Sequence, residues 1–331
     1  MSFDPGYLAV FVATRLGTTF VGMPITGALT RTQANYVPKE KDDVAAEEKG
    51  QVQDGKSAEI GVLAMLGRTW KLEGARGIFK GLLPAALASI AGSLGSAALT
   101  HFGIATKGSV GASVGAAIAL GILFIPFSVL TSRSIVSPLR LPFAKKSIRG
   151  VTSARERKEP LRLWDVPGMI ANVTIQTLAP IAVTALTFPL LYAAAAAASP
   201  EMQDNDGPVT RYALAYIICN TLPTLWVVPL NVLQEKLSVA PDADATELMA
   251  TDAEFERSAT EDVVTPRRKP RYTGLIDAYN TVKKEEGVCA LYRGWVWTAL
   301  RLLVPAVSEV AAAINVSHAQ TVVDLGTRTF N

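Results

Sequence analysis

Six long apolar segments alternate along the chain with segments that hold most of its charged residues. The apolar segments cover approximately residues 6–33, 79–103, 108–132, 169–198, 209–235 and 293–319. A helix needs about 20 residues to cross the roughly 30 Å of hydrocarbon in a bilayer. Because backbone polar groups in lipid must be satisfied within their own segment, these lengths predict six transmembrane helices.

Prolines divide the apolar pattern into three similar parts. Pro24, Pro126 and Pro229 each lie in the second half of an apolar segment, and they are separated by 102 and 103 residues. Seven residues after each proline stands a cation, namely Arg31, Arg133 or Lys236. A pattern that recurs with this period indicates duplication of one unit. We therefore predict three repeats, at residues 1–105, 106–200 and 201–331.

A second pattern precedes the second and the sixth apolar segments. Residues 73–81 and 286–294 both read acid-Gly, four residues, aromatic, cation, Gly. Apolar side chains recur at helical spacing before each copy, which predicts a short amphipathic helix. They are Ile60, Leu63, Leu66 and Trp70 in the first repeat, and Leu275, Ile276, Tyr279 and Val282 in the third. The glycine after each acid can end that helix in a left-handed conformation. In the middle repeat, Glu159-Pro160 and Val166-Pro167-Gly168 stand at the corresponding positions.

Taken together, these patterns resemble the mitochondrial carrier family over nearly the whole chain. The resemblance is strong in the third repeat, good in the first and weak in the second. It implies an all-α membrane protein with six transmembrane helices in three pseudo-threefold repeats, each with a short matrix-side surface helix. It also implies kinks at the three prolines and a central cavity that opens alternately to either side. The chain termini would face the intermembrane space.

Composition and charge distribution are typical of a membrane protein. Hydrophobic residues make up 49% of the chain and charged residues 18%, whereas soluble proteins carry about 25% charge. Residues 133–162 and 236–293 hold most of the cations in the connecting segments. Cations favour the side that is not translocated, so the three long loops should share one side, and the termini and two short loops the other. A net charge of +3 is too small to suggest a nucleic-acid partner; membrane lipid is the expected surrounding.

One departure from the family concerns its charged gate. The family carries an acid two residues, and a base five residues, after each proline, and these charges close the matrix side with salt bridges. Here the acid positions hold Thr26, Ser128 and Asn231, and the base positions hold Leu29, Thr131 and Gln234. Charge pairs that form in one state and break in the other bias a two-state equilibrium. Their absence argues against ordinary exchange transport.

A few polar residues within the predicted spans are candidates for contact with a solute. Arg301 stands seven residues after Gly294, where the family places a substrate-contacting residue, so the resemblance implies a contact set of Ser89, Gln176 and Arg301. Charges at membrane depth usually face a cavity or a partner, which adds Arg15 and Glu309. Alternatively, Arg301 forms a structural salt bridge with Glu309, and Arg15 extends to the membrane interface. Pro24, Pro126, Pro229, Asn231 and Gln234 form the predicted gate and kink set.

Two polar inserts interrupt the pattern. Residues 39–56 are charged and rich in small residues, and residues 241–265 are acidic. Such compositions bury too little apolar surface to order themselves, so we expect disordered loops, including an acidic insert at about residues 240–266. Solvated loops are the usual case, and the alternative is that the acidic loop binds a protein partner. We predict no cleavable targeting segment at the N-terminus, and Cys219 and Cys289 give no disulfide framework.

No enzyme motif is present. The chain has no phosphate-binding Gly-x4-Gly-Lys loop, no Cys/His metal spacing and no nucleophile beside a histidine, so we predict neither catalysis nor a cofactor or metal. One hypothesis is a transporter that moves a small metabolite, with an anion as one option, across the mitochondrial inner membrane by alternating access. The other is a carrier-like scaffold or adaptor of the outer mitochondrial membrane that does not transport. The intact third repeat and Arg301 favour transport; the missing gate charges, the weak middle repeat and the acidic loop favour the scaffold.

Overall fold

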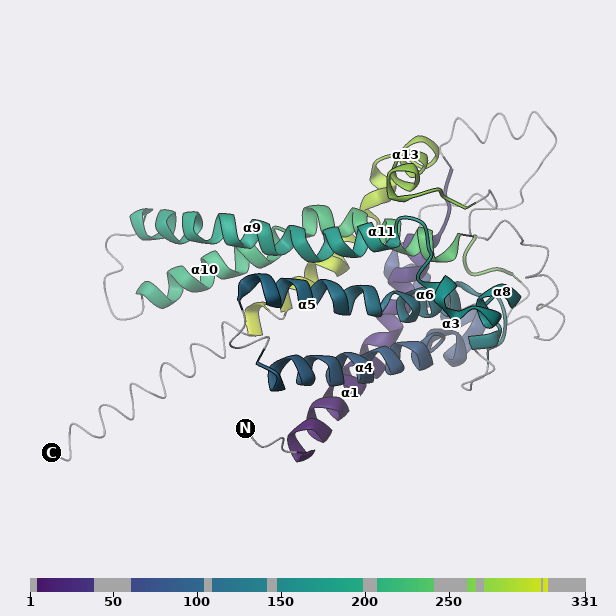
Figure 1. Cartoon of the computed structure of the whole chain (residues 1–331). Helices are drawn as coiled ribbons and strands as arrows, with labels where there is room; N and C mark the ends of the chain where they lie inside the picture. The colour runs from purple at the N-terminus through teal and green to yellow at the C-terminus, as the bar shows by residue number, and fades with distance from the viewer. Residues whose placement is uncertain are drawn as a thin grey trace. The chain divides into compact units, whose positions relative to one another are not determined.

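The computed structural model describes residues 5–38, 61–103, 109–141, 148–198, 207–240, 261–265, 271–304 and 306–308, which are predominantly helical and contain no β-strand. The elements drawn in Figure 1 are α1 (Pro5–Ala34), α3 (Val62–Ile78), α4 (Leu82–His101), α5 (Val110–Leu123), α6 (Ile125–Val136), α8 (Ala154–Lys158), the 3-10 helix η1 (Pro160–Leu163), α9 (Met169–Ala198), α10 (Gly207–Thr221), α11 (Thr224–Val239), α13 (Leu275–Glu285) and the 3-10 helix η2 (Cys289–Tyr292). Residues 295–304 are also helical. The insert at residues 39–56 lies outside the described residues.

Four helical stretches within the described residues are long and apolar enough to cross a membrane, and the pair α5 and α6 makes a fifth if it counts as one span. The four are Ala9–Ala34, Leu82–His101, Met169–Leu191 and Ala215–Val239. At most 28% of the most apolar part of any of them is buried inside the molecule, so their apolar side chains need an outside apolar phase, which lipid supplies for helices of this length. The predicted sixth span begins in the helix at residues 295–304, but residues 309–319 lie outside the described part of the chain.

The bend between α5 and α6 confirms the kink predicted near Pro126. The two helices meet at Phe124 with an angle of 41°. Proline lacks an N–H and clashes with the carbonyl four residues earlier, which here belongs to Ile122. The indole Nε1 of Trp164 donates a hydrogen bond of 2.9 Å to that carbonyl. An aromatic side chain from the neighbouring loop therefore compensates for the backbone donor that proline removes.

No helix break occurs at the other two prolines. Pro24 lies inside α1 and Pro229 inside α11, and both helices continue through them. In the fifth apolar segment the chain leaves helical structure at Leu222 and Pro223, between α10 and α11. The break in that segment therefore precedes Pro229.

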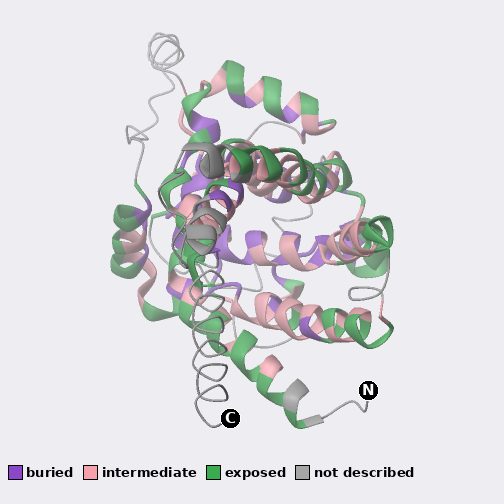
Figure 2. Ribbon diagram, turned by 90° about the vertical axis from the view of Figure 1, so that its left-hand side faces the viewer, coloured by how far each residue is buried: buried purple, intermediate pink, exposed green. Residues whose placement is uncertain are grey.

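The two predicted amphipathic helices are present, but in each of them part of the predicted apolar face is exposed. α3 buries Val62, Met65 and Thr69, whereas Leu63 is 65% and Trp70 59% exposed. α13 likewise exposes Ile276 and Tyr279 while burying Ala278 and Val282. Exposed residues of this kind are drawn in green in Figure 2. Each helix thus presents apolar side chains outward, as a helix at a membrane interface does.

The predicted glycine conformations after the two acids are confirmed. Gly74 has φ 68° and lies within α3, where the helix is interrupted, and Gly287 has φ 97° directly after the end of α13. Residues with a side chain rarely adopt a positive φ, whereas glycine adopts it at no steric cost. Both glycines therefore turn the chain away from the surface helix toward the next segment.

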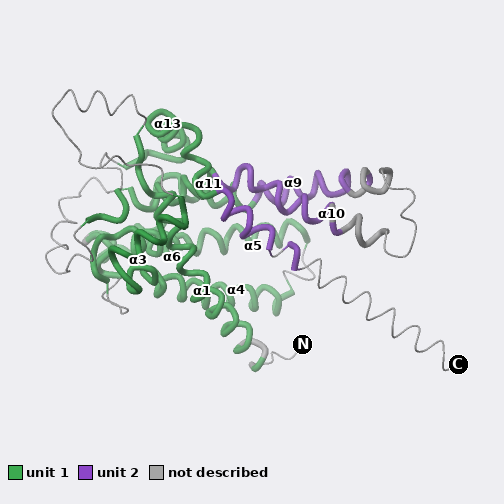
Figure 3. The backbone as a smooth tube through the Cα atoms, turned by 180° about the vertical axis from the view of Figure 1, so that it is seen from behind, with its two compact units in different colours: residues 1–177, 229–294 green, residues 178–228, 295–331 purple. Residues whose placement is uncertain are grey.

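The chain divides into two compact units, coloured separately in Figure 3. Unit 1 comprises residues 1–177 and 229–294, and unit 2 comprises residues 178–228 and 295–331. The largest core of unit 1 joins the ends of the long helices to the surface elements: Ile125 and Val129 of α6, Met169 of α9, Leu233 and Leu237 of α11, and Val282 of α13. In unit 2, Cys219 of α10 is fully buried, and its Sγ lies 3.3 Å from Oγ1 of Thr187 in α9.

Candidate functional site

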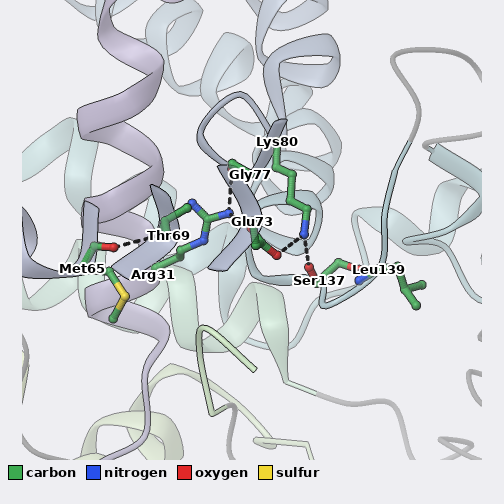
Figure 4. Close-up of polar contacts among 8 residues, drawn as sticks. All are labelled: Arg31, Met65, Thr69, Glu73, Gly77, Lys80, Ser137 and Leu139. Carbon is green, nitrogen blue, oxygen red and sulfur yellow. Dashed lines mark hydrogen bonds and ion pairs between the residues drawn. The ribbon is translucent and has the colours of Figure 1, made fainter. Parts of the chain in front are cut away.

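Three buried groups of ionised side chains lie in unit 1, and each contains one of the cations that follow the prolines. Cluster 1 consists of Arg31, Glu73 and Lys80 (Figure 4). Nη2 of Arg31 lies 3.0 Å from Oε2 of Glu73 and donates to the carbonyl of Gly77 at 2.8 Å. Nζ of Lys80 pairs with Oε1 of Glu73 and donates to the carbonyl of Ser137 at 2.9 Å. The three side chains are between 2% and 4% exposed, so cluster 1 holds its charges away from water.

Cluster 3 repeats this arrangement in the third repeat, with Lys236, Glu286 and Arg293. Nζ of Lys236 lies 2.6 Å from Oε1 of Glu286, and Nη1 of Arg293 lies 2.7 Å from Oε2 of the same carboxylate. Both cations also donate to the carbonyl of Asn35, at 3.4 Å and 2.8 Å. One carboxylate is therefore shared by two cations, as in cluster 1.

Cluster 2 is smaller and consists of Arg133 and Glu156. Nη1 of Arg133 lies 2.8 Å from both carboxylate oxygens, and its Nε donates to the carbonyl of Ser238 at 2.9 Å. Glu159, which stands where the family pattern places the acid, instead pairs with Arg162 on the surface. That hydrogen bond from Arg162 lowers the pKa of Glu159. The acid that pairs with Arg133 is thus Glu156 and not Glu159.

The sequence patterns identified these cations and two of the acids but did not predict that they pair. The separation along the chain from cation to acid is 42, 23 and 50 residues in the three repeats, which hides the equivalence. A local signal for Glu156 does exist: Ser153 and Glu156 form a reciprocal capping box at the start of α8. A Ser-x-x-Glu motif of this kind marks a helix start, and it fixes the carboxylate that Arg133 meets.

The surplus positive charge of clusters 1 and 3 is balanced by main-chain carbonyls. The last carbonyls of a helix lack partners within the helix and carry partial negative charge. Asn35 and Ser137 directly follow α1 and α6, and Ser238 lies in the last turn of α11. Burial lowers the pKa of Lys80, and the carboxylate of Glu73 opposes that shift. Each cation is thus placed at a helix end that favours its charge.

These carbonyl contacts connect the predicted repeats in a cycle. A cation of each repeat donates to the end of the first helix of the next: Lys80 to Ser137, Arg133 to Ser238, and Arg293 to Asn35. The path runs from the first repeat to the second, from the second to the third, and from the third back to the first. We call these three helix ends and their clusters the ionic ring. All its members belong to unit 1.

Two of the residues predicted to contact a solute are joined to neighbouring helices. The hydroxyl of Ser89 in α4 lies 2.6 Å from that of Thr19 in α1. Nε2 of Gln176 in α9 donates to Oε1 of Gln234 in α11 at 2.9 Å. Ser89 is thereby placed on the α1–α4 interface and Gln176 on the α9–α11 interface, both within unit 1.

The charged residues predicted to contact a solute are exposed where the structure describes them. Arg15 is exposed, and its guanidinium lies 5.3 Å from the ring centroid of Phe11, an arrangement that suits a membrane interface. Arg301 is exposed and belongs to unit 2, whereas Ser89 and Gln176 belong to unit 1. Glu309 lies outside the described residues. The joint contact set of Ser89, Gln176 and Arg301 therefore remains a prediction.

The gate positions carry neutral side chains with modest contacts. Asn231 and Gln234 are half-buried in α11, and the hydrogen bond from Gln176 involves one of them. Thr30 and Glu235 directly follow the base positions in α1 and α11. Oγ1 of Thr30 donates to Oε1 of Glu235 at 3.4 Å. The ring cations Arg31, Arg133 and Lys236 stand two residues after the base positions on the same helices. Among the described residues, the ion pairs next to the gate positions are therefore those of the ring.

Part of the predicted acidic insert is packed within unit 1. Val263 and Val264 are 8% and 4% exposed and belong to a small apolar cluster with Ala34 and Met65. The main chain of Thr265 is bonded to Tyr36 and to the side chain of Asn35. The prediction of disorder for residues 240–266 is therefore corrected for residues 261–265, because two adjacent valines within the acidic sequence find an apolar site. Residues 241–260 and 266–270 lie outside the described residues.

Comparison with known proteins gives no assignment: no protein-family model matches the chain, and no curated protein is similar to it.

Proposed function

We propose that this protein is a divergent carrier that moves a small, anionic metabolite across a mitochondrial membrane by alternating access. The observation that carries the proposal is the ionic ring. Its three cations follow their prolines at the same distance, and its contacts lead from the third repeat back to the first. Six helices arranged as three repeats around one lumen would give such a cycle, whereas an open row of helices has no contact between its last and first members.

Residue equivalence adds support to the threefold arrangement. Ser137 and Asn35 both stand eleven residues after the proline of their helix, and both accept a hydrogen bond from the cation of an aromatic-cation-Gly motif. Lys80 and Arg293, the two donors, each stand seven residues after the acid of their cluster. Two contacts between corresponding sequence positions, each from a cation to a main-chain carbonyl, are what duplication of one structural unit predicts.

Arg301 supplies the proposed selectivity for an anion. It stands in the predicted sixth span, and an exposed guanidinium in a lipid-embedded helix is costly unless it faces water, a partner or a ligand. A planar guanidinium binds carboxylate or phosphate through two parallel hydrogen bonds. Ser89 and Gln176 would orient the bound solute, after exchanging their contacts with Thr19 and Gln234. The inner mitochondrial membrane is the proposed location, with the long loops in the matrix.

A second candidate function is a carrier-like scaffold that does not transport, located in the outer membrane. The gate positions favour it, since Thr26, Ser128, Asn231, Leu29, Thr131 and Gln234 carry no charge. Neutral hydrogen bonds such as that between Gln176 and Gln234 contribute about 1 kcal/mol each, which limits how strongly they can bias one state of a transporter. The acidic insert would then bind a protein partner.

Reconstitution of the full chain into liposomes with a panel of anionic, cationic and neutral solutes separates the two. Transport predicts uptake of an anion, together with a rise in thermal stability when that anion is added in detergent. Arg301→Ala should abolish both effects, while Arg149→Ala, an exposed arginine between α6 and α8, should leave both unchanged. Uptake of no solute by a protein that unfolds cooperatively would reject transport and favour the scaffold.

A further inference from the structure

We propose that residues 261–265 form a plug that closes the ring end of the lumen and takes the place of the missing charged gate. The inference rests on the proposed function, because a plug requires a lumen. Among the described residues of the acidic insert, this segment packs two valines into the apolar cluster at the ends of the helices. No sequence pattern predicted that site, and the function proposed above does not use it.

The site of the plug is built from equivalent positions of the three repeats. Ala34, Val136 and Val239 each stand ten residues after the proline of their helix. Ala34 and Val136 are buried in the same cluster as Val263 and Val264, and Val239 packs against that cluster. These three residues end α1, α6 and α11, so the two valines meet the terminal turns of all three helices that form the ionic ring. A segment in that place covers the point where the three ends converge.

The plug is fixed to the ring through main-chain groups. Tyr36 N–H donates to the carbonyl of Thr265 at 2.9 Å, and Thr265 N–H donates to Oδ1 of Asn35 at 3.1 Å. Nη2 of Arg68 donates to the carbonyl of Asp262 at 3.1 Å. Asn35 therefore holds the plug with its side chain and accepts from Arg293 with its carbonyl. The plug and the ring therefore share one residue.

An apolar plug also suits the chemistry of the gate positions. The neutral residues at those positions cannot close an opening with salt bridges, whereas apolar side chains exclude water without any charge. Two valines flanked on the N-terminal side by Glu261 and Asp262 present an apolar surface inward, while both acidic side chains remain exposed. The segment thus has a buried apolar part, Val263 and Val264, and an exposed charged part, Glu261 and Asp262.

Thiol labelling tests the plug without needing a known solute. In full-length protein with Cys219→Ser and Cys289→Ser, a cysteine at Ala34 reports on the site beneath the plug, and a cysteine at Ala28 reports on the buried core of the same helix. A thiol reacts only where the reagent can reach it. In proteoliposomes, a water-soluble maleimide should label Ala34→Cys slowly in the parent protein and at least about tenfold faster after Val263→Ser with Val264→Ser. The conservative pair Val263→Ile with Val264→Ile should retain slow labelling.

The Ala28→Cys reporter separates opening of the plug from loss of fold. It should remain protected in the serine variant if only the plug is displaced. Fast labelling at both reporters in the serine variant, with slow labelling at both in the isoleucine variant, would mean that the valines stabilise the fold as a whole, and would overturn the plug. Unchanged labelling of Ala34→Cys would overturn it as well. Neither outcome depends on solute uptake, so failure of the transport proposal is scored separately by the liposome panel.

Discussion

Arg133 and Glu156 are joined through a single nitrogen, with Nη1 of the arginine 2.8 Å from both carboxylate oxygens. Oε2 of Glu156 also accepts a hydrogen bond of 2.9 Å from the main chain of Ser153. The carboxylate therefore links the last turn of α6 to the first turn of α8, and its side chain is only 4% exposed. Through Arg133 it is connected further to the end of α11, so this one pair joins α6, α8 and α11 within the ionic ring.

Loss of Glu156 should be strongly destabilising. Glu156→Gln leaves a largely buried guanidinium without its carboxylate, and removal of one partner from a buried pair costs about 3–5 kcal/mol. Glu159→Gln is the matched control, because the same change there affects an exposed pair. Thermal unfolding in detergent should show a clear drop in midpoint for the first variant and none for the second. Equal midpoints would show that the pair of Arg133 and Glu156 does not hold this part of the fold together.

Cluster 3 predicts unequal effects for an acid and a cation that touch each other. Glu286→Gln removes the carboxylate that Lys236 and Arg293 share and should cost about 3–5 kcal/mol. Arg293→Met leaves the pair between Lys236 and Glu286 intact and should cost less, about 1.5–3 kcal/mol for the lost charged hydrogen bonds. The free energies of unfolding of both variants, measured under one set of conditions, give the comparison. A larger loss for Arg293→Met would contradict the sharing of one carboxylate by two cations.

Gly294 predicts a steric effect where the chain after η2 contacts α1. A Cβ at this position would lie 2.3 Å from Cδ1 of Leu29, and the residue has φ 73°. Gly294→Ala should therefore destabilise by about 1–3 kcal/mol through strain and overpacking. Gly67→Ala is the control: Gly67 lies in α3 with nothing within 4 Å of its would-be Cβ, so alanine there should stabilise by about 0.5–1 kcal/mol. Opposite signs are expected in chemical unfolding, and equal stabilisation of both variants would refute the close contact.

Lys80 predicts a dependence of stability on alkaline pH. Burial lowers its pKa from the ordinary 10.5, against the opposing effect of Glu73. Between the lowered pKa and 10.5, the unfolded chain binds more protons at this site than the folded protein does, so the free energy of unfolding rises with pH. The parent protein should gain stability relative to Lys80→Met from neutral pH toward 10.5, by about 1.4 kcal/mol for each unit of lowering. A relative loss over the same range would mean that the ion pair outweighs burial.

The sequence predicted the long helices well because a run of apolar residues depends on local composition alone. It also predicted the bend at Pro126, since proline acts on the backbone directly. It did not predict the break at Leu222 and Pro223, where a second proline precedes Pro229. The exposed apolar faces of α3 and α13 were found as patterns, but a pattern does not say whether protein or lipid covers it.

The ion pairs and the packed valines could not be predicted for a different reason. Arg133 and Glu156 lie in contact because of how α6, α8 and their loop pack, and the family pattern pointed to Glu159 instead. Val263 and Val264 stand in an acidic sequence whose average composition indicates disorder. Composition averages over a segment, whereas two adjacent valines can pack once three helix ends present an apolar site.

Closure of the ring between its first and third repeats is the central claim, and one cross-link tests it most directly. Thr30 in α1 and Glu235 in α11 lie 3.4 Å apart at their oxygen atoms. In protein without Cys219 and Cys289, Thr30→Cys with Glu235→Cys should be joined by a short thiol cross-linker, so that cleavage at a protease site inserted after Glu47 leaves the two fragments linked. The control is Arg15→Cys with Glu235→Cys, because Arg15 lies about four helical turns from Thr30 along α1. In this variant the two fragments should separate after cleavage. Fragments that separate in both variants would contradict the closed ring.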